Sequence, residues 1–256
     1  MKFDDLDKKM RVFETAHDLC VLPELYMVAR IDGRNFSRLT KEICQFEAPF
    51  DERFRDYMTQ TVRHLMNCGF SIVYGYTESD EISLLFDFNE TSFSRKHRKY
   101  NSILASEAAG QFSVLLGRPA AFDCRLCVLS NPALVVDYFR WRAADAHRNA
   151  LNAHCYWRLR KDGCSVKTAT RKLEGMGVDE KNELLFSYGI NFNDLPAWQK
   201  RGIGLYWTKV QKEGKNPLTG ESATAVRRVL KTDMDLPVKD AYGTFIFNLI
   251  SAQMSD

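Results

Sequence analysis

The stretch FSIVYGYTESDEISLLFDF, residues 70–88, decides the fold because it holds two apolar, strand-length runs and the turn between them. The runs FSIVYGY (70–76) and EISLLFDF (81–88) are rich in β-branched and aromatic residues. The intervening Thr77-Glu78-Ser79-Asp80 has the composition of a turn. The stretch therefore predicts a β-hairpin.

Two further strand-length runs flank this hairpin along the chain. LYMVARI (25–31) stops at Asp32-Gly33, and FDCRLCVL (122–129) alternates as a strand does. Helical patterns lie between them, from about Asp51 to Asn67 and over residues 95–116. The order strand, helix, strand, strand, helix, strand is the ferredoxin-like βαββαβ unit, which is also the unit of polymerase palms. We therefore expect an α/β (α+β) fold with a palm-type antiparallel sheet.

The remainder of the chain predicts additional helices and a C-terminal extension. Asn131 and Pro132 fit the N-cap and first position of a long helix over 132–147 or beyond, and Ser165 fits the cap of another. The last predicted elements are a short strand at 202–210 and a basic tail that contains Arg227, Arg228 and Lys231. We expect a palm-like catalytic domain at 1–130 and a helical, basic region at 131–256 packed on it, or one domain overall.

Positive charge is unevenly distributed in this chain. The total of 36 Lys and Arg against 33 Asp and Glu gives only +3. Between Arg140 and Lys172, nine Lys and Arg face two Asp, so this window carries +7 and the remainder −4. A second cluster, Arg95-Lys96-His97-Arg98-Lys99, lies apart from the first. Such concentration is typical of a surface for a polyanion, with solvated helical faces as the alternative.

The seven cysteines are an odd, scattered set (20, 44, 68, 124, 127, 155 and 164). The N-terminal MKFDDLDKKM is too charged for a signal peptide, and no apolar run approaches 18 residues. We therefore expect a cytoplasmic protein with reduced thiols. Cys124 and Cys127 have the spacing of metal ligands but no second pair nearby, and their strand pattern disfavours a zinc site.

The predicted topology makes the acidic residues informative. In a βαββαβ unit the first and third strands are antiparallel neighbours, so the end of the first abuts the start of the third. Asp32 would therefore meet Asp80 and Glu81 at one edge of the sheet, although they are nearly fifty positions apart. Carboxylates brought together repel one another unless cations lie between them. Oxygen ligands of this kind suit Mg²⁺, and a pair of ions would serve an in-line phosphoryl displacement.

Four motifs resemble the signatures of the tRNA(His) guanylyltransferase family. They are Arg30-Ile31-Asp32-Gly33-Arg34-Asn35-Phe36, Glu78-Ser79-Asp80-Glu81-Ile82-Ser83, Trp141-Arg142-Ala143-Ala144-Asp145-Ala146-His147 and Asp179-Glu180-Lys181-Asn182-Glu183-Leu184-Leu185-Phe186. They follow the family's order and spacing over about residues 10–210. The resemblance implies a palm fold with two Mg²⁺ that joins nucleotides to an RNA 5′ end, opposite in direction to ordinary polymerases.

The resemblance also implies roles for particular residues. Asp32 and Asp80 would bind both metals through their side chains, and Gly33 through its carbonyl. Contacts to the nucleoside triphosphate, GTP or ATP, would come from Asp32, Gly33, Arg34, Asn35, Phe36, Ser37, Ser79, Asp80, Arg95, Lys96, Arg98, Lys99, Lys181 and Asn182. The basic region would bind tRNA through Arg142, His147, Arg148, Arg158 and Arg160. The family's habit of forming homotetramers would extend to this chain.

Two departures from the family pattern bear on substrate choice. The eukaryotic enzymes that act on tRNA(His) read Phe-Ala-Lys-Pro-Asn-Asp where this chain has Phe46-Glu47-Ala48-Pro49-Phe50-Asp51. They also carry His-Ile-Asn-Asn where this chain has His147-Arg148-Asn149-Ala150. The chain therefore looks more similar to the family's "like proteins", which repair 5′-truncated tRNAs by copying the opposite strand of the acceptor stem.

Other functions stay open on the sequence alone. A true tRNA(His) guanylyltransferase adding a single 5′ G is the first alternative. A palm-fold nucleotidyl cyclase is the second, although a cyclase needs no long basic surface and would form product from nucleotide without tRNA. A non-catalytic RNA-binding module is the third, and its RNA binding would be indifferent to a metal chelator.

Overall fold

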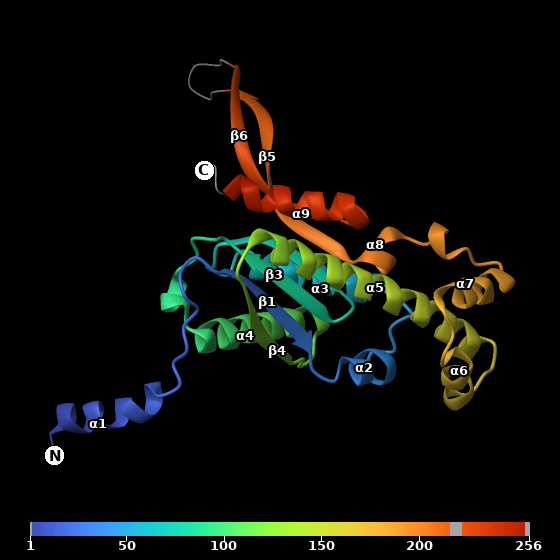
Figure 1. Cartoon of the computed structure of the whole chain (residues 1–256), viewed down its shortest axis with the longest axis horizontal. Helices are drawn as coiled ribbons and strands as arrows, with labels where there is room; N and C mark the ends of the chain where they lie inside the picture. Colours follow the sequence, from blue (N-terminus) through green and yellow to red (C-terminus); the bar gives the residue numbers. More distant parts are fainter. Residues whose placement is uncertain (1, 216–221, 254–256) are drawn as a thin grey trace.

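A computed structural model describes residues 2–215 and 222–253 of the chain. Within these residues the centre is a six-stranded antiparallel sheet in the order β4-β1-β3-β2-β5-β6 (Figure 1). The strands are β1 (Tyr26–Gly33), β2 (Ile72–Glu78), β3 (Glu81–Phe86), β4 (Phe122–Leu129), β5 (Ile203–Lys215) and β6 (Ser222–Asp233). The four strands predicted from the hairpin outward therefore form one sheet in the βαββαβ order, and the predicted α+β fold is confirmed.

Some of the helices among the described residues cover the two faces of this sheet, and others lie outside it. The helices are α1 (Phe3–Thr15), α2 (Phe36–Arg38), α3 (Glu52–Leu65), α4 (His97–Leu116), α5 (Pro132–Lys161), α6 (Val166–Leu173), α7 (Val178–Ser187), α8 (Ala197–Arg201) and α9 (Lys239–Gln253). Short π and 3-10 segments occupy Leu39–Ile43, Ser92–Arg95 and Phe192–Asp194. One core joins α3 and α4 to one face, and a second joins α5 and α9 to the other. A third core unites the end of α5 with α6 and α7.

The predicted helix starts are confirmed by their caps. The Asp51 carboxylate accepts hydrogen bonds from the amides of Arg53 and Phe54 at the start of α3. Asn131 and Ser165 cap α5 and α6 through the amides of Leu134 and Thr168. These side chains satisfy amides that the first helical turn leaves without a partner.

Alternation along the strands assigns each side chain to a face. In β1, Met27, Ala29 and Ile31 belong to the core under α3 and α4, whereas Tyr26 and Val28 belong to the core under α5 and α9. Arg30 and Asp32 continue the second set. The carboxylate of Asp32 therefore lies on the α5 side of the sheet.

The same alternation bears on the Cys-x-x-Cys pair. On β4, Cys124 packs against the α3–α4 core and Cys127 against the α5–α9 core. The two thiols point to opposite faces and cannot ligate one ion. All seven cysteines are free.

The C-terminal part differs from the sequence prediction. The expected short strand at 202–210 is the first half of a long hairpin, in which β6 pairs with β5 along its length. Arg227, Arg228 and Lys231 lie on β6 and so belong to a strand. Helix α9 had no sequence signal strong enough to predict it, because it contains Gly243 and β-branched residues that form helices poorly. The glycine allows α9 to approach α5 closely, since a Cβ there would lie 3.3 Å from the Val136 side chain.

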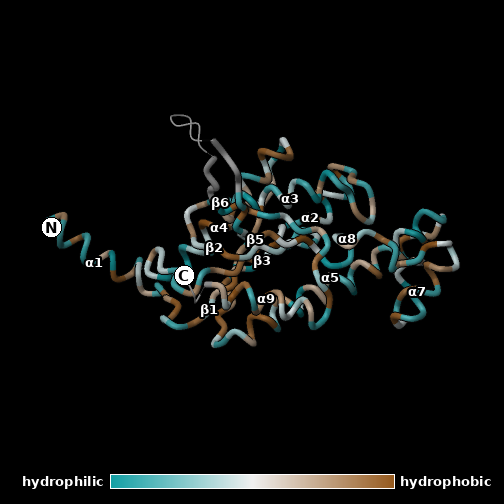
Figure 2. The backbone as a smooth tube through the Cα atoms, turned by 90° about the horizontal axis from the view of Figure 1, so that it is seen from above, coloured by the Kyte–Doolittle hydropathy of each residue, from teal (hydrophilic) through white to brown (hydrophobic). Residues whose placement is uncertain are grey.

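Two segments stand away from the body of the molecule. Helix α1 projects at the N-terminal end and contains no buried residue (Figures 1 and 2). The far ends of β5 and β6 extend at the top of Figure 1, beyond the other strands of the sheet. Figure 2 shows hydrophobic backbone segments gathered where the sheet lies, whereas α1 alternates in polarity. Among the described residues, no helix combines the length and apolar character needed to cross a membrane.

Candidate active site

Two carboxylates from distant parts of the sequence meet at one edge of the sheet. Asp32, near the end of β1, is the register partner of Glu81, the first residue of β3. The amide of Gly33 donates to the carbonyl of Asp80, with N and O 3.0 Å apart. The Ser79 hydroxyl donates to the Asp80 carboxylate at 3.1 Å. We call Asp32, Glu78, Asp80 and Glu81 the acid edge.

Electrostatics at this edge favour a bound cation. Burial raises the pKa of the Asp80 carboxyl, and the negative charge of Asp32 raises it further. Compensation is weak, because the nearest cations of Asp32 are Arg30 and Arg125, with nitrogen–oxygen distances of 4.0 and 3.9 Å. A cation between the two carboxylates would remove the cost of keeping them both ionised.

Arg142 holds the other half of the acid edge in place. Its side chain is only 3% exposed and donates to both oxygens of Glu81, at 2.6 and 3.0 Å. It also pairs with Glu78 at 3.5 Å and Asp145 at 3.0 Å. Arg30 donates to the same Glu81 carboxylate from the other side. The sequence suggested tRNA contact for Arg142, but the structure buries this guanidinium among carboxylates and leaves it no exposed donor for a phosphate.

Glu78 has an unusual position beside Asp80. Burial raises the pKa of the Glu78 carboxyl to about 8, and the neighbouring charge of Glu81 adds to the shift. Arg142 opposes this effect but does not cancel it. Burial and the neighbouring carboxylates therefore make a negative charge on Glu78 costly.

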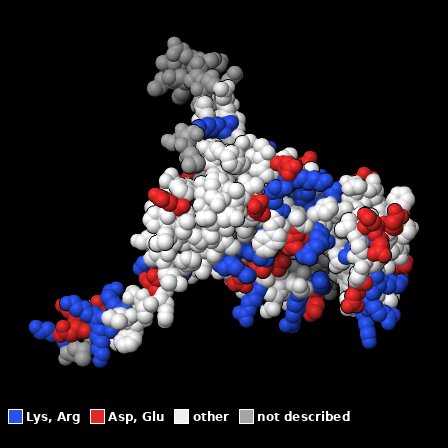
Figure 3. Space-filling model, viewed as in Figure 1, with Lys and Arg blue, Asp and Glu red and all other residues white. Residues whose placement is uncertain are grey.

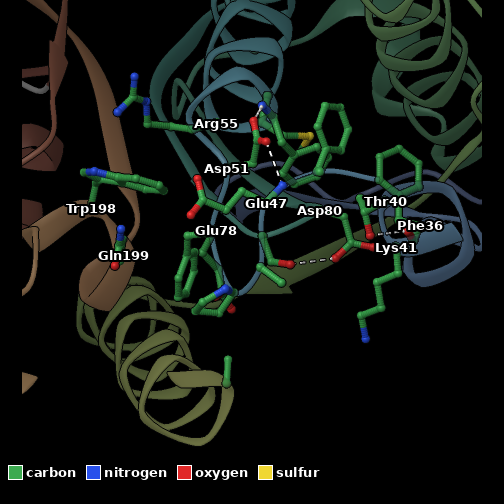
Figure 4. A pocket seen from close by; sticks show the side chains of 18 of the residues that line it. Phe36, Thr40, Lys41, Glu47, Asp51, Arg55, Glu78, Asp80, Trp198 and Gln199 are labelled. Atoms are coloured by element: carbon green, nitrogen blue, oxygen red, sulfur yellow. Dashed lines mark hydrogen bonds between the residues drawn. The ribbon is translucent and has the colours of Figure 1, made fainter. Parts of the chain in front are cut away.

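A cavity of about 250 Å³ opens beside the acid edge (Figure 4). Glu78, Ser79 and Asp80 form one wall, and Figure 4 shows Trp198 and Gln199 across from them. The rest of the lining is mainly aromatic and apolar, with two basic, two acidic and three hydroxyl side chains. It comes from the segment after β1 and from β2, α3, α5 and β5: Phe36, Ser37, Thr40, Lys41, Phe46, Glu47, Ala48, Pro49, Phe50, Asp51, Phe54, Arg55, Met58, Thr77, Ala153, Trp157 and Ile203. Aromatic walls next to carboxylates suit a ligand with a flat ring and a metal-bound phosphate.

The donor set of the acid edge fits Mg²⁺. Two carboxylates and the Gly33 carbonyl offer only oxygen, which is the ligand type that Mg²⁺ prefers. Among the residues that the structure describes, no group of three or more His, Cys, Asp or Glu side chains is arranged to enclose a metal ion. This agrees with Mg²⁺ sites that use one or two carboxylates and take their other ligands from phosphates and water.

The predicted nucleotide residues after β1 directly follow Asp32 and Gly33, and Phe36 and Ser37 among them line the cavity. Asn35 has a left-handed backbone, with φ of 61°, and opens α2. Arg34, Asn35 and Ser37 are exposed, whereas Phe36 is buried and packs against Gly33. A Cβ on Gly33 would lie 2.5 Å from the Phe36 ring, so this close approach explains the glycine. The segment is therefore placed for contact with a ligand, except that the Phe36 ring mainly serves the core.

The basic residues 95–99 lie at the opposite end of the sheet. The Arg95 side chain is buried and donates to the carbonyl of Leu25, directly before β1. Lys96 and Arg98 bind the Asp18 carboxylate, and Lys99 lies near the Phe93 ring. The length of β1 separates them from Asp32 by about 20 Å. Within one chain, Arg95, Lys96, Arg98 and Lys99 therefore do not reach the acid edge.

The remaining residues predicted to bind nucleotide or tRNA lie on two helices, α7 and α5. Lys181 and Asn182 lie on α7; the Asn182 amide bonds its own helix at Val178, and neither residue lines the cavity among the described residues. On α5, His147 is exposed and its ring contacts Phe192, and Arg148 is 74% exposed beside Asp145.

Arg158 and Arg160, on the last turns of α5, are half-buried. Arg158 lies over the Tyr188 ring, and Arg160 donates to the Cys164 carbonyl. Of the five residues suggested for tRNA, Arg148 has the guanidinium most open to a phosphate.

Several residues of the cavity carried no sequence signal. Lys41 and Arg55 bring positive charge to its walls, and Trp157 and Trp198 bring aromatic surface. They come from four separate elements, so no spacing in the sequence marks them as neighbours. Only their clustering on the folded chain identifies them.

The fold and the acid edge define a palm-type α+β protein with a carboxylate pair at the sheet edge. Residues 7–130 match the family model described as tRNAHis guanylyltransferase, and residues 133–246 match the Thg1 C terminal domain. A probable tRNA(His) guanylyltransferase of Mus musculus is 33% identical over 91% of this chain and 84% of its own. The tRNA(His) guanylyltransferase of Schizosaccharomyces pombe is 35% identical over 71% of this chain and 73% of its own.

Solved structures agree. The crystal structure of the Saccharomyces cerevisiae tRNA(His) guanylyltransferase aligns with a TM-score of 0.70 at 29% identity, over 76% of this chain and 91% of that one. A bacterial guanylyltransferase-like protein in complex with ATP aligns with a TM-score of 0.77 at 23% identity, over 96% and 99%. The chain belongs to the tRNA(His) guanylyltransferase family, a family of nucleotidyltransferases.

Proposed function

We propose that this chain is a Mg²⁺-dependent 3′–5′ nucleotidyltransferase that adds template-matched nucleotides to the 5′ end of truncated tRNA. The observation that carries the proposal is the meeting of Asp32 with Asp80, which lines an aromatic cavity, in a chain of this family. Family membership supports transfer of a nucleotide. The details of the site support the choice of substrate.

The metal would be held by the Asp32 and Asp80 carboxylates and the Gly33 carbonyl. Bound there as two ions, Mg²⁺ would neutralise charge on the phosphates and stabilise the attacking and leaving oxygens. The raised pKa of Asp80 supports this assignment, because burial and then the charge of Asp32 make the ionised carboxylate costly unless a cation is bound to it. Arg142 and Arg30 would keep Glu81 fixed behind the metal ligands.

The cavity would hold the incoming nucleoside triphosphate. In the proposed reaction its 3′-hydroxyl attacks the phosphorus of an activated 5′ end, which is a 5′-triphosphate or an adenylylated 5′-monophosphate. A bond from the 3′ oxygen to phosphorus forms, the bond to pyrophosphate or AMP breaks, and the hydroxyl proton passes to solvent. The chain contributes mainly by positioning, as in other phosphoryl transfers. The aromatic walls would hold the base, and Lys41 and Arg55 would add positive charge.

Two alanines favour repair over dedicated tRNA(His) guanylylation. Ala48 lines the cavity, so a methyl group stands where the tRNA(His) enzymes carry a lysine. Ala150 is 2% exposed in the core between α5, α6 and α7. It offers no polar group to RNA, unlike the asparagine of those enzymes. Specificity would then depend on pairing between the incoming base and its template.

Addition of a single 5′ G to tRNA(His) is the second candidate function. It is favoured by the relatives, which carry the name tRNA(His) guanylyltransferase in animals and fungi. A homotetramer, which the family resemblance implies, would be one arrangement that brings residues 95–99 of one chain to the acid edge of another.

The test is incubation with Mg²⁺, labelled nucleoside triphosphates and tRNAs that lack the first 5′ nucleotide. We expect labelled tRNA to form only when tRNA and Mg²⁺ are both present. Product formed from nucleotide alone would indicate a cyclase. Chelator-resistant tRNA binding without turnover would indicate a binding module.

A further inference from the structure

A second cavity, of about 380 Å³, lies between α5, the end of α8 and the start of α9. We call it the α5–α9 cavity. Its lining consists of Arg140, Ala143, Ala144, His147, Arg201, Leu236, Pro237, Val238, Lys239 and Tyr242. On α5 these residues follow helical spacing, and Arg142, which points to the acid edge, lies on the opposite side of the helix. The α5–α9 cavity is therefore separate from the cavity beside Asp80.

The lining residues of the α5–α9 cavity are basic or apolar, and none is acidic. Figure 3 shows Lys and Arg side chains gathered where α8 and the start of α9 meet α5. Arg140 pairs with Asp240 at 3.0 Å and Arg201 with Asp235 at 3.1 Å. Those two carboxylates are 94% and 83% exposed, so the pairs hold their arginines weakly. Arg140 is therefore able to bind another anion, whereas Arg201 is also held by its hydrogen bond to the Leu236 carbonyl at 2.7 Å.

Two further features make the α5–α9 cavity attractive to an anion. The α9 helix, 15 residues long, begins at Lys239 on its rim and contributes the positive end of a helix dipole. Burial lowers the pKa of His147, and the positive charges of Lys200 and Arg201 lower it further. These two charges add to the positive potential beside the cavity.

The apolar floor suggests more than a free ion. Leu236 and Tyr242 are 1% and 2% exposed and close the bottom of the cavity, and Pro237 and Val238 form its side. A phosphate on the rim would place an attached sugar against these residues. Arginine, lysine and an apolar floor together are typical of contacts with a nucleic-acid backbone.

The outer side of α5 connects this cavity to the acid edge. Trp141 is 55% exposed, and the guanidinium of Arg142 lies 4.5 Å from the centre of its ring. Ala144 and Arg148 are also exposed on this side. An exposed indole is a platform on which a base stacks, and the helix to be crossed is about 10 Å wide.

We infer that the α5–α9 cavity binds a backbone phosphate of the RNA substrate, whose strand then crosses the exposed side of α5 to the acid edge. The inference rests on the proposed function, since it assumes that the chain binds tRNA. It adds Arg140 and Lys239 to the RNA-binding residues and gives Trp141 a stacking role.

The test compares the wild-type chain with the double variant Arg140→Gln/Lys239→Gln. The matched control, Lys9→Gln/Arg11→Gln on α1, removes the same charge and also breaks one exposed ion pair. For each protein, the affinity for a tRNA lacking its first 5′ nucleotide is measured against salt concentration, and ATP affinity is measured in parallel. Thermal unfolding checks the fold, and Lys239→Gln alone, an exposed position, replaces the double variant if that one is unstable.

We expect the cavity variant to bind tRNA several-fold more weakly, while its ATP affinity is unchanged. The salt slope, which is the slope of the logarithm of the tRNA binding constant against the logarithm of salt concentration, should be shallower by about 1. The control should resemble the wild type. An unchanged slope, or an equal loss in the control, overturns the inference. A parallel fall in ATP affinity also overturns it and assigns the cavity to free nucleotide. If the wild-type chain binds no tRNA, the proposed function itself is wrong. If the wild-type chain binds tRNA and the cavity variant binds it equally well, only the inference about the α5–α9 cavity is wrong.

Discussion

The acid edge and the basic cluster at residues 95–99 lie at opposite ends of the same sheet, and both stood out in the sequence by their charge. At the acid edge, strand register brings Asp32 to Glu81 and Asp80. At the other end, Lys96 and Arg98 are bound to Asp18, and Arg95 is buried against the Leu25 carbonyl. The predicted strand order was enough to place the acidic residues together, because it determines which strand ends are neighbours. The positive charge of residues 95–99 did not indicate where in the fold they lie.

The largest expected effect concerns the arginine that holds the acid edge. Arg142→Ala should lower the free energy of unfolding by about 3–5 kcal/mol, because it leaves Glu78 buried without a cation and Glu81 with Arg30 as its remaining partner. Urea unfolding measures the change. The control is Arg148→Ala on the same helix, which should cost less than about 1 kcal/mol because its pair with Asp145 is exposed. Equal losses for the two variants would contradict the network described here.

The next prediction compares how substitutions at the two ends of the sheet change the rate of nucleotide addition. Asp32→Ala and Asp80→Ala should each lower the rate of nucleotide addition more than roughly a hundredfold while the fold stays intact. The control Asp18→Ala removes a carboxylate from the basic end and should leave the rate within a few-fold of wild type. Near-normal turnover by a folded Asp32 or Asp80 variant would contradict the assignment of these residues as ligands of two metal ions. Without metal, Asp80→Ala should be slightly more stable than wild type, since it removes a buried charge.

A smaller effect is expected at the exposed side of α5. Arg148→Gln should weaken tRNA binding several-fold and reduce the salt slope by about 1, because it removes one phosphate contact. Filter binding at a series of salt concentrations measures both quantities. An affinity that does not change between low and physiological salt, even for the wild type, would mean that the basic surface of α5 is only solvated.

The smallest effect is at the basic end and depends on pH. Hydrogen bonds from Arg98 and then Lys96 lower the pKa of the Asp18 carboxyl to about 2, from an ordinary value of 3.8. This stabilising contribution is complete above the ordinary value and is lost as the pH falls towards 2. Asp18→Asn should therefore be slightly less stable than wild type at pH 7, and the difference should vanish near pH 2. Thermal unfolding across pH tests this, and a difference independent of pH would refute it.

The core of the fold was predictable because its signals are local. Strand-length apolar runs, turn residues at 77–80 and caps at Asp51, Asn131 and Ser165 act over a few residues. The helix α9 and the length of the β5–β6 hairpin were not predictable. Their sequences form helix or strand only because tertiary contacts, such as Gly243 against Val136, override weak local preference.

The candidate site also contains residues that were predictable from the sequence and residues that were not. Asp32 and Asp80 followed from topology, since register depends on strand order alone. The role of Arg142 did not, because it depends on the rotation of α5 on the sheet, which turns this guanidinium to Glu81 and leaves Arg148 in solvent. The walls of the cavity come from several elements and acquire meaning only in the folded chain.

The activity proposed for the acid edge is the addition of nucleotides to a 5′ end by copying a template. It is tested by a competition between a truncated non-histidine tRNA and full-length tRNA(His), scored by the nucleotide added. Because Ala48 and Ala150 offer no polar group to either substrate, we expect the truncated tRNA to be preferred and extended with the base complementary to the nucleotide across the acceptor stem. A wrong pair should cost about 1–3 kcal/mol. A strong preference for full-length tRNA(His), with G added whatever base lies opposite, would contradict this proposal and establish single-G addition.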